Sequence, residues 1–118
     1  ILTSNFKIGA DLKLDSVGLK DYFTFGGYGD GAGEKWHSAE LAVSQAERMA
    51  GAPFGKESIY LIGDTCYDIT CARKLGIRSI AVATGWADQE TLKAAKPDYF
   101  FADLSDPENF YHAINLNI

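Results

Sequence analysis

The sequence predicts an α/β fold in which a parallel sheet is covered by helices on both faces. Three short apolar runs, 59–62, 79–83 and 99–101, are each followed by a segment with apolar residues at helical spacing. The runs lack polar alternation, which is typical of strands buried on both sides. Strands that alternate with helices favour a parallel sheet. With 118 residues, 47% of them hydrophobic, the chain can form one packed domain.

Composition argues against several partners. The chain has 16 acidic and 11 basic residues and no run of Lys or Arg, so we expect no nucleic-acid partner. No apolar stretch approaches the roughly 20 residues that cross a bilayer, so we expect no membrane partner. Without a secretory signal, and with Cys66 and Cys71 at neither zinc nor disulfide spacing, the sequence indicates a cytoplasmic protein. It does not specify an oligomeric state.

The first half is expected to begin at the end of a buried strand, residues 1–3. Because the chain does not open with methionine, we expect further residues upstream. A helix follows over about 6–17, then a second short strand within 19–25 and a glycine-rich loop over 26–33. A long helix over 36–49 is ended by glycine and proline.

The second half repeats a strand followed by a helix. Strands are expected at the three apolar runs, and helices at about 69–75, 88–95 and 107–114. Ligands of open α/β sheets bind beyond the C-terminal ends of the strands. We therefore expect Thr3, Asp64 and Thr84 to line one edge of the sheet.

Asp64 and Asp68 are the most specific signal, because these two acids flank the junction of a buried strand and a helix. Neighbouring carboxylates oppose each other's ionisation unless a cation lies between them. Mg²⁺ prefers oxygen ligands and keeps waters that a phosphate can replace. The alternative is structural: Asp64 caps the helix, and Asp68 is a first-turn acid stabilised by the helix dipole.

Thr3, Ser4 and Asn5 form a second candidate site, where a strand runs into a helix. A hydroxyl beside a helix N-terminus is suited to bind an anion. The alternative is that one of the three side chains caps the helix.

The motifs at 62–69 and 82–85 resemble the fourth motif of the haloacid-dehalogenase (HAD) superfamily and the strand that follows it. Residues 97–104 resemble the family's closing segment, and residues 1–5 resemble its second motif. The phosphoglycolate-phosphatase-like branch is the nearest in pattern. The resemblance implies a Rossmann-like three-layer core with helices on both faces of its sheet.

The resemblance also implies roles for the candidate residues. In the family the first acid, here Asp64, ligates Mg²⁺, and the second, Asp68, supports the metal or its waters. A residue at the place of Thr3 hydrogen-bonds the transferring phosphoryl group, helped by backbone N–H groups at the start of the next helix. The implied ligand is a small phosphorylated metabolite.

Lys35 stands where the family has a basic residue that neutralises the phosphate and the nucleophile. Members often have proline two or three residues later, whereas this chain has residues 36–38 as Trp, His and Ser, so position carries the assignment. Lys56 is the competing candidate. The expected phosphate-binding set is Thr3, Ser4, Asn5 and Lys35, with Thr3 and Lys35 as its catalytic members.

The family's nucleophile belongs to an Asp-x-Asp pattern on the first strand, and residues 1–118 contain no such pattern. We therefore expect the chain to be the C-terminal portion of a HAD core, with the nucleophile strand and the cap domain outside it. The segment alone is expected to be inactive. The intact protein is expected to hydrolyse a phosphomonoester through an aspartyl-phosphate.

Three other interpretations were compared with this one. The dehalogenase branch works without a metal and typically lacks the pair Gly63 and Asp64. A degenerate α/β module that binds phosphate or a protein would also lack a nucleophile. A flavodoxin-like or receiver domain shares the alternating pattern, but it predicts an acidic cluster after the first strand, which this chain does not show.

Overall fold

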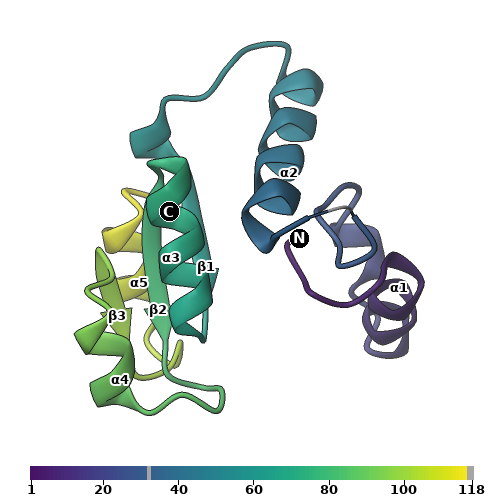
Figure 1. Ribbon diagram of the computed structural model, residues 1–118. Coiled ribbons are helices and arrows are strands. Elements are labelled where there is room, and N and C mark those ends of the chain that lie inside the picture. Colours follow the sequence, from purple (N-terminus) through teal and green to yellow (C-terminus); the bar gives the residue numbers. More distant parts are fainter. Residues whose placement is uncertain (32, 117–118) are drawn as a thin grey trace. The chain divides into compact units, whose positions relative to one another are not determined.

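The computed structural model describes residues 1–31 and 33–116 (Figure 1). The chain divides into two compact units, Ile1–Pro53 and Phe54–Ile118. Each unit is described by itself below.

The first unit is mainly helical. Helix α1 spans Lys7–Ser16, a short 3-10 helix η1 spans Lys20–Tyr22, and helix α2 spans Lys35–Ala50. Gly51 follows α2 with φ of 73°, a left-handed conformation that glycine adopts without strain. The two helices expected in this half are therefore confirmed.

The prediction of a strand within 19–25 is wrong. These residues form η1 and its flanks, and the parallel partner of Leu2 is Gly27, in the segment expected to be a loop. Thr3 N donates to Gly27 O at 3.0 Å, and Gly27 N donates to Ile1 O at 2.9 Å. A methyl group on Gly27 would lie 2.1 Å from the Ser38 carbonyl oxygen, so only glycine allows this close approach.

The second unit contains a parallel sheet of three strands. After a 3-10 helix η2, Lys56–Ser58, the elements alternate as expected from the sequence. They are β1 (Tyr60–Gly63), α3 (Cys66–Leu75), β2 (Arg78–Val82), α4 (Gln89–Ala94), β3 (Tyr99–Phe101) and α5 (Pro107–Ala113). The strand order is β1-β2-β3, with Ile62 opposite Ile80 and Ala81 opposite Phe100 (Figure 1).

Helices cover both faces of this sheet. Ile69 of α3, Ala81 of β2 and Leu92 of α4 form a buried cluster, and Phe100 packs against it. Neighbouring side chains of a strand point to opposite faces, so Phe101 belongs to the other face. There its ring meets Phe110 of α5 at a centroid distance of 5.8 Å. The expected layering of helices on both faces is confirmed within this unit.

Among the residues that the structure describes, no helix is both long and apolar enough to cross a membrane.

Candidate functional site

Asp64 and Asp68 lie at the C-terminal end of β1, on the turn into α3. The strand ends at Gly63, and Thr65 is the N-cap of the helix. A methyl group on Gly63 would lie 2.2 Å from Cγ of Asp68, so the strand passes directly over that carboxyl group. The sequence expectation that both acids share one end of the strand is confirmed.

Asp68 has a structural role that the sequence analysis offered as an alternative. Its side chain is 5% exposed, and its Oδ2 accepts from Thr65 N at 3.0 Å and from Thr65 Oγ1 at 2.7 Å. Thr65 Oγ1 accepts in return from Asp68 N at 3.4 Å, which completes a capping box. These bonds satisfy N–H groups of the first turn and fix the Asp68 carboxyl group in place.

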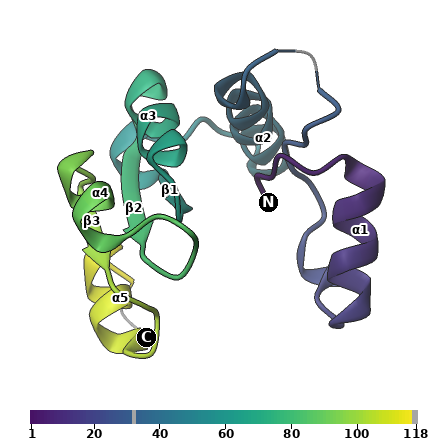
Figure 2. The same cartoon turned by 60° about the horizontal axis from the view of Figure 1, so that its bottom comes forward.

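The N-cap of α3 is Thr65, so the alternative that Asp64 caps this helix is wrong. The Asp64 carboxylate packs instead against the loop that joins β2 to α4, which Figure 2 shows beside the end of the sheet. A methyl group on Gly85 would lie 1.9 Å from Oδ2 of Asp64. Thr84 precedes that glycine, so the second unit brings Asp64 and Thr84 to one edge, as expected.

The loop after β2 is held on both sides of this contact. Ala83 and Ala87 pack against the buried cluster, and Ala83 N donates to Phe101 O at 2.9 Å. Trp86, between them, has 103% of its reference surface exposed. The loop therefore presents Gly85 to Asp64 from an anchored position.

Acidic residues dominate this edge of the second unit. They follow strands or occupy N-caps and first helical turns: Asp64, Asp68, Asp88, Glu90, Asp103, Asp106 and Glu108. Lys and Arg residues instead precede strands, begin them or occupy last helical turns: Lys56, Arg73, Lys74, Arg78, Lys93 and Lys96. Helix dipoles favour this segregation, because α3, α4 and α5 each start at the acidic edge. The charge of this edge is therefore suited to a cation.

The position of Lys56 argues against it as the basic residue of the site. It lies in η2, before the start of β1, whereas Asp64 follows the end of that strand. The two residues are therefore at opposite ends of the strand. Lys35 is left as the candidate.

In the first unit, Thr3 Oγ1 accepts from Asn5 N at 3.1 Å and from Asn5 Nδ2 at 2.9 Å. Helix α1 begins later, with Phe6 as an N-cap that makes no side-chain hydrogen bond. Thr3, Ser4 and Asn5 therefore do not cap the helix. A hydroxyl has two acceptor lone pairs, and with both directed to Asn5 the Thr3 O–H is placed to donate elsewhere.

Asp30 is a residue that the sequence analysis missed. Its Oδ1 accepts from the backbone N of Lys7, the first residue of α1, at 3.2 Å. The carboxylate thus occupies one of the N–H groups at the start of α1, the helix whose N-terminus was expected to bind an anion. The sequence did not indicate this role, because Asp30 lies in a glycine-rich run and its contact joins residues 23 apart along the chain.

Lys35 is the first residue of α2 and is partly buried. The turn is fixed by its neighbours, since Glu34 N donates to Nδ1 of His37 at 3.0 Å in a capping box. Gly27 hydrogen-bonds Thr3 and packs on Ser38 of the same helix, so Thr3 and the first turn of α2 contact one glycine. The meeting of Thr3 and Lys35 with Asp64 at one site stays a prediction.

Comparisons with known proteins agree with this geometry. A family model described as HAD-hydrolase-like matches residues 38–107, more than half of the chain. A phosphoglycolate phosphatase from Synechococcus elongatus is 30% identical over 106 residues, which are 90% of this chain and 47% of that protein. The pyrophosphatase PpaX from Oceanobacillus iheyensis is 24% identical over 90% of this chain and 48% of its own length.

A solved structure shares the fold. It is a haloacid dehalogenase-like hydrolase family protein from Streptococcus pneumoniae, with a TM-score of 0.73 and 22% identity over 94% of this chain and 50% of that one. The chain thus spans about half the length of the relatives that it matches. The family model, together with acids at the end of β1, shows that the chain belongs to the HAD-like hydrolase family.

Proposed function

We propose that residues 1–118 form the phosphate- and magnesium-binding part of a HAD-type phosphohydrolase that acts on a small phosphomonoester. The observation that carries the proposal is the acid pair Asp64 and Asp68 at the C-terminal end of β1 in a member of this family. On this proposal the chain is the C-terminal portion of the core. The nucleophile strand and the cap belong to a segment outside it.

The residues at the edge fit Mg²⁺. The ion is usually held by one or two carboxylates, with waters and substrate oxygens completing its shell. A site with one or two carboxylates is consistent with the structure, because the described residues contain no group of three or more His, Cys, Asp or Glu able to hold a metal. Asp64 is the direct ligand on this proposal, and Asp68, bound to Thr65, keeps the turn in place. When bound, the ion offsets negative charge between the acidic edge and the phosphate.

The first unit supplies hydrogen bonds and positive charge. The Thr3 hydroxyl donates to a phosphoryl oxygen, because its lone pairs are engaged by Asn5. The Lys35 ammonium offsets the charge of the phosphate. Since Asp30 already accepts from the first N–H of α1, that N–H group contributes little to anion binding.

On this proposal the reaction has two steps. A carboxylate oxygen of the nucleophilic aspartate attacks phosphorus, and the P–O bond to the alcohol breaks. The leaving alkoxide oxygen takes a proton from water or from an acid outside residues 1–118 and departs as the alcohol. Water then attacks the acyl phosphate and releases inorganic phosphate and the free carboxylate. The positive charge of Lys35 stabilises the phosphoryl oxygens in both steps.

The test is phosphate release by the full-length protein from 2-phosphoglycolate, pyrophosphate and p-nitrophenyl phosphate, with and without Mg²⁺. Activity should require the ion, Asp64→Asn should abolish it, and Asp68→Asn should lower it about 10–100-fold. Glu57→Gln is the matched control, because this acid of the same unit lies in η2, before the start of β1 and away from the proposed metal site. Turnover without a metal would contradict the proposal. Phosphate binding without any turnover would favour a non-catalytic module.

A further inference from the structure

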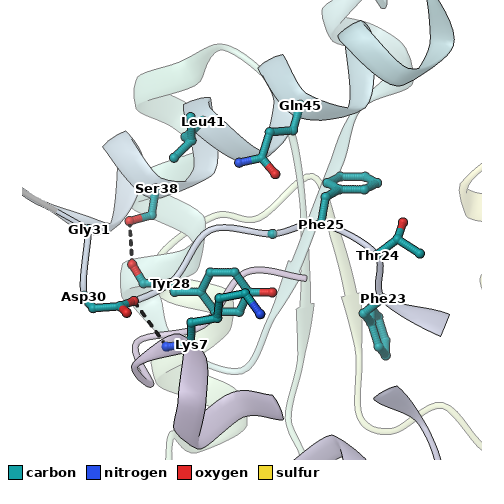
Figure 3. Close-up of a pocket in the computed structure, with 11 residues that line it drawn as sticks. Lys7, Phe23, Thr24, Phe25, Tyr28, Asp30, Gly31, Ser38, Leu41 and Gln45 are labelled. Atoms are coloured by element: carbon teal, nitrogen blue, oxygen red, sulfur yellow. Dashed lines mark hydrogen bonds between the residues drawn. The ribbon is translucent and has the colours of Figure 1, made fainter. Parts of the chain in front are cut away.

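The first unit contains a pocket of about 380 Å³ that the proposed phosphatase site does not use (Figure 3). This volume is within the range of about 300–1,000 Å³ that is typical of small-molecule sites. It lies between the start of α1, one face of α2 and the segment that joins the two helices. The residues that line it are Lys7, Phe23, Thr24, Phe25, Gly26, Tyr28, Asp30, Gly31, Ser38, Leu41 and Gln45.

Tyr28 forms a fixed aromatic floor. Its carbonyl oxygen accepts from Ser38 Oγ at 3.1 Å and from Gly31 N at 3.2 Å. A methyl group on Gly26 would lie 3.2 Å from Cζ of Tyr28, so the backbone packs close to the ring. Lys7 Nζ lies over one face of the ring, 5.4 Å from its centroid, so a stacked ligand would use the other face. Because the residue is held by its backbone and by contacts to its ring, a ligand would meet a preformed surface.

The charged groups of the lining are already paired. Lys7 Nζ donates to Asp11 Oδ2 at 2.7 Å, and Asp30 accepts from the backbone of Lys7. One ammonium and one carboxylate among the lining residues give the pocket no net charge. A charged ligand would therefore gain little from this pocket, whereas an uncharged one would lose little on leaving water.

Gln45 is the polar group that the pocket leaves for a ligand. It is partly buried, and no hydrogen bond in the described part of the chain engages its amide. Figure 3 shows this amide reaching from α2 toward the Tyr28 ring, with Phe25 and Thr24 beside it. A Gln amide offers a donor and an acceptor side by side, which matches N6 and N7 of adenine. Bases also stack on aromatic side chains.

We propose that this pocket binds an uncharged adenine-type purine, with its ring on Tyr28 and its edge on the Gln45 amide. The aromatic side chains of Phe23 and Phe25 complete the walls. This site is separate from the proposed phosphatase residues, and its occupancy does not depend on turnover.

The test is calorimetric titration of the full chain with adenosine, inosine, ribose and AMP. Adenosine should bind, ribose should not, and AMP should bind no tighter than adenosine, because the lining has no spare positive charge. Inosine lacks the 6-amino donor and should bind more weakly. Gln45→Leu should weaken adenosine binding about fivefold to 140-fold, since a bidentate pair with a base discriminates by about 1–3 kcal/mol and 1.4 kcal/mol is tenfold.

Two further variants complete the design. Ser44→Ala, one residue earlier in α2 and outside the lining, should bind adenosine like the wild type. Tyr28→Leu should abolish binding, and its circular dichroism spectrum establishes whether the unit is still folded. If Tyr28→Leu unfolds, Gln45→Leu alone decides. Three results would overturn the proposal: no adenosine binding at millimolar concentration, unchanged affinity in Gln45→Leu, or AMP binding far tighter than adenosine.

Discussion

A methyl group added at Gly85 should weaken Mg²⁺ binding by displacing Asp64. The Cβ of Gly85→Ala would lie 1.9 Å from Oδ2 of Asp64, whereas ordinary van der Waals contact begins at 3.4 Å. The carboxylate must therefore move by the difference, about 1.5 Å (3.4 minus 1.9). Metal–ligand distances tolerate deviations of only about 0.2 Å. A displaced ligand costs about 10–100-fold in metal affinity.

The loss of stability in Gly85→Ala should be smaller than the loss caused by overpacking a closed core. Asp64 is only partly buried, so its side chain can turn toward solvent. Overpacking in a closed core costs about 1–3 kcal/mol, and we expect the free energy of unfolding to fall by no more than the lower part of that range. Gly9→Ala is the control for Mg²⁺ affinity, because no heavy atom lies within 4 Å of its added methyl group and the affinity should not change.

The assay is calorimetric titration of the full chain with Mg²⁺, with urea unfolding measured in parallel. A double-mutant cycle isolates the mechanism: in the background of Asp64→Asn, Gly85→Ala should have no further effect on Mg²⁺ affinity. Wild-type affinity in a folded Gly85→Ala variant would refute the reasoning. If Gly85→Ala lowers Mg²⁺ affinity equally with and without the Asp64 carboxylate, the methyl group acts through another contact.

Further predictions concern stability. Hydrogen bonds from the backbone N–H and hydroxyl of Ser79 lower the pKa of Asp98, so its contribution is present above the ordinary carboxyl pKa and is lost as pH falls through the lowered value. Ser79→Ala removes only the hydroxyl bond to this carboxylate and should cost about 1–2 kcal/mol at neutral pH, because Asp98 is largely exposed. Urea melts from pH 7 to pH 3 should show a smaller difference from the wild type at low pH, and a constant difference would contradict this. Gly9→Ala should raise the free energy of unfolding by about 0.5–1 kcal/mol, because Gly9 lies inside α1. Gly27→Ala should instead destabilise the first unit by several times that amount, because its methyl group would meet the Ser38 carbonyl at 2.1 Å, and a thermal melt of both variants gives the comparison.

Local pattern in the sequence was enough for most of the second unit. The strands at β1, β2 and β3 and the helices between them were predicted from apolar runs, helical spacing and terminating glycines, and each lies where expected. These signals work because each depends on residues that are near one another along the chain. The acids at the end of β1 followed in the same way, since a strand end and a helix start are adjacent in sequence.

The pairing of Leu2 with Gly27, the contact of Gly85 with Asp64 and the cap that Asp30 gives to α1 required the tertiary structure. Each joins segments about 20 residues or more apart, and the loops that form them carry glycines or short polar residues without periodicity. Residue spacing reveals which groups share an element. The packing of distant backbone segments decides which of those groups meet, and that packing is absent from any local pattern.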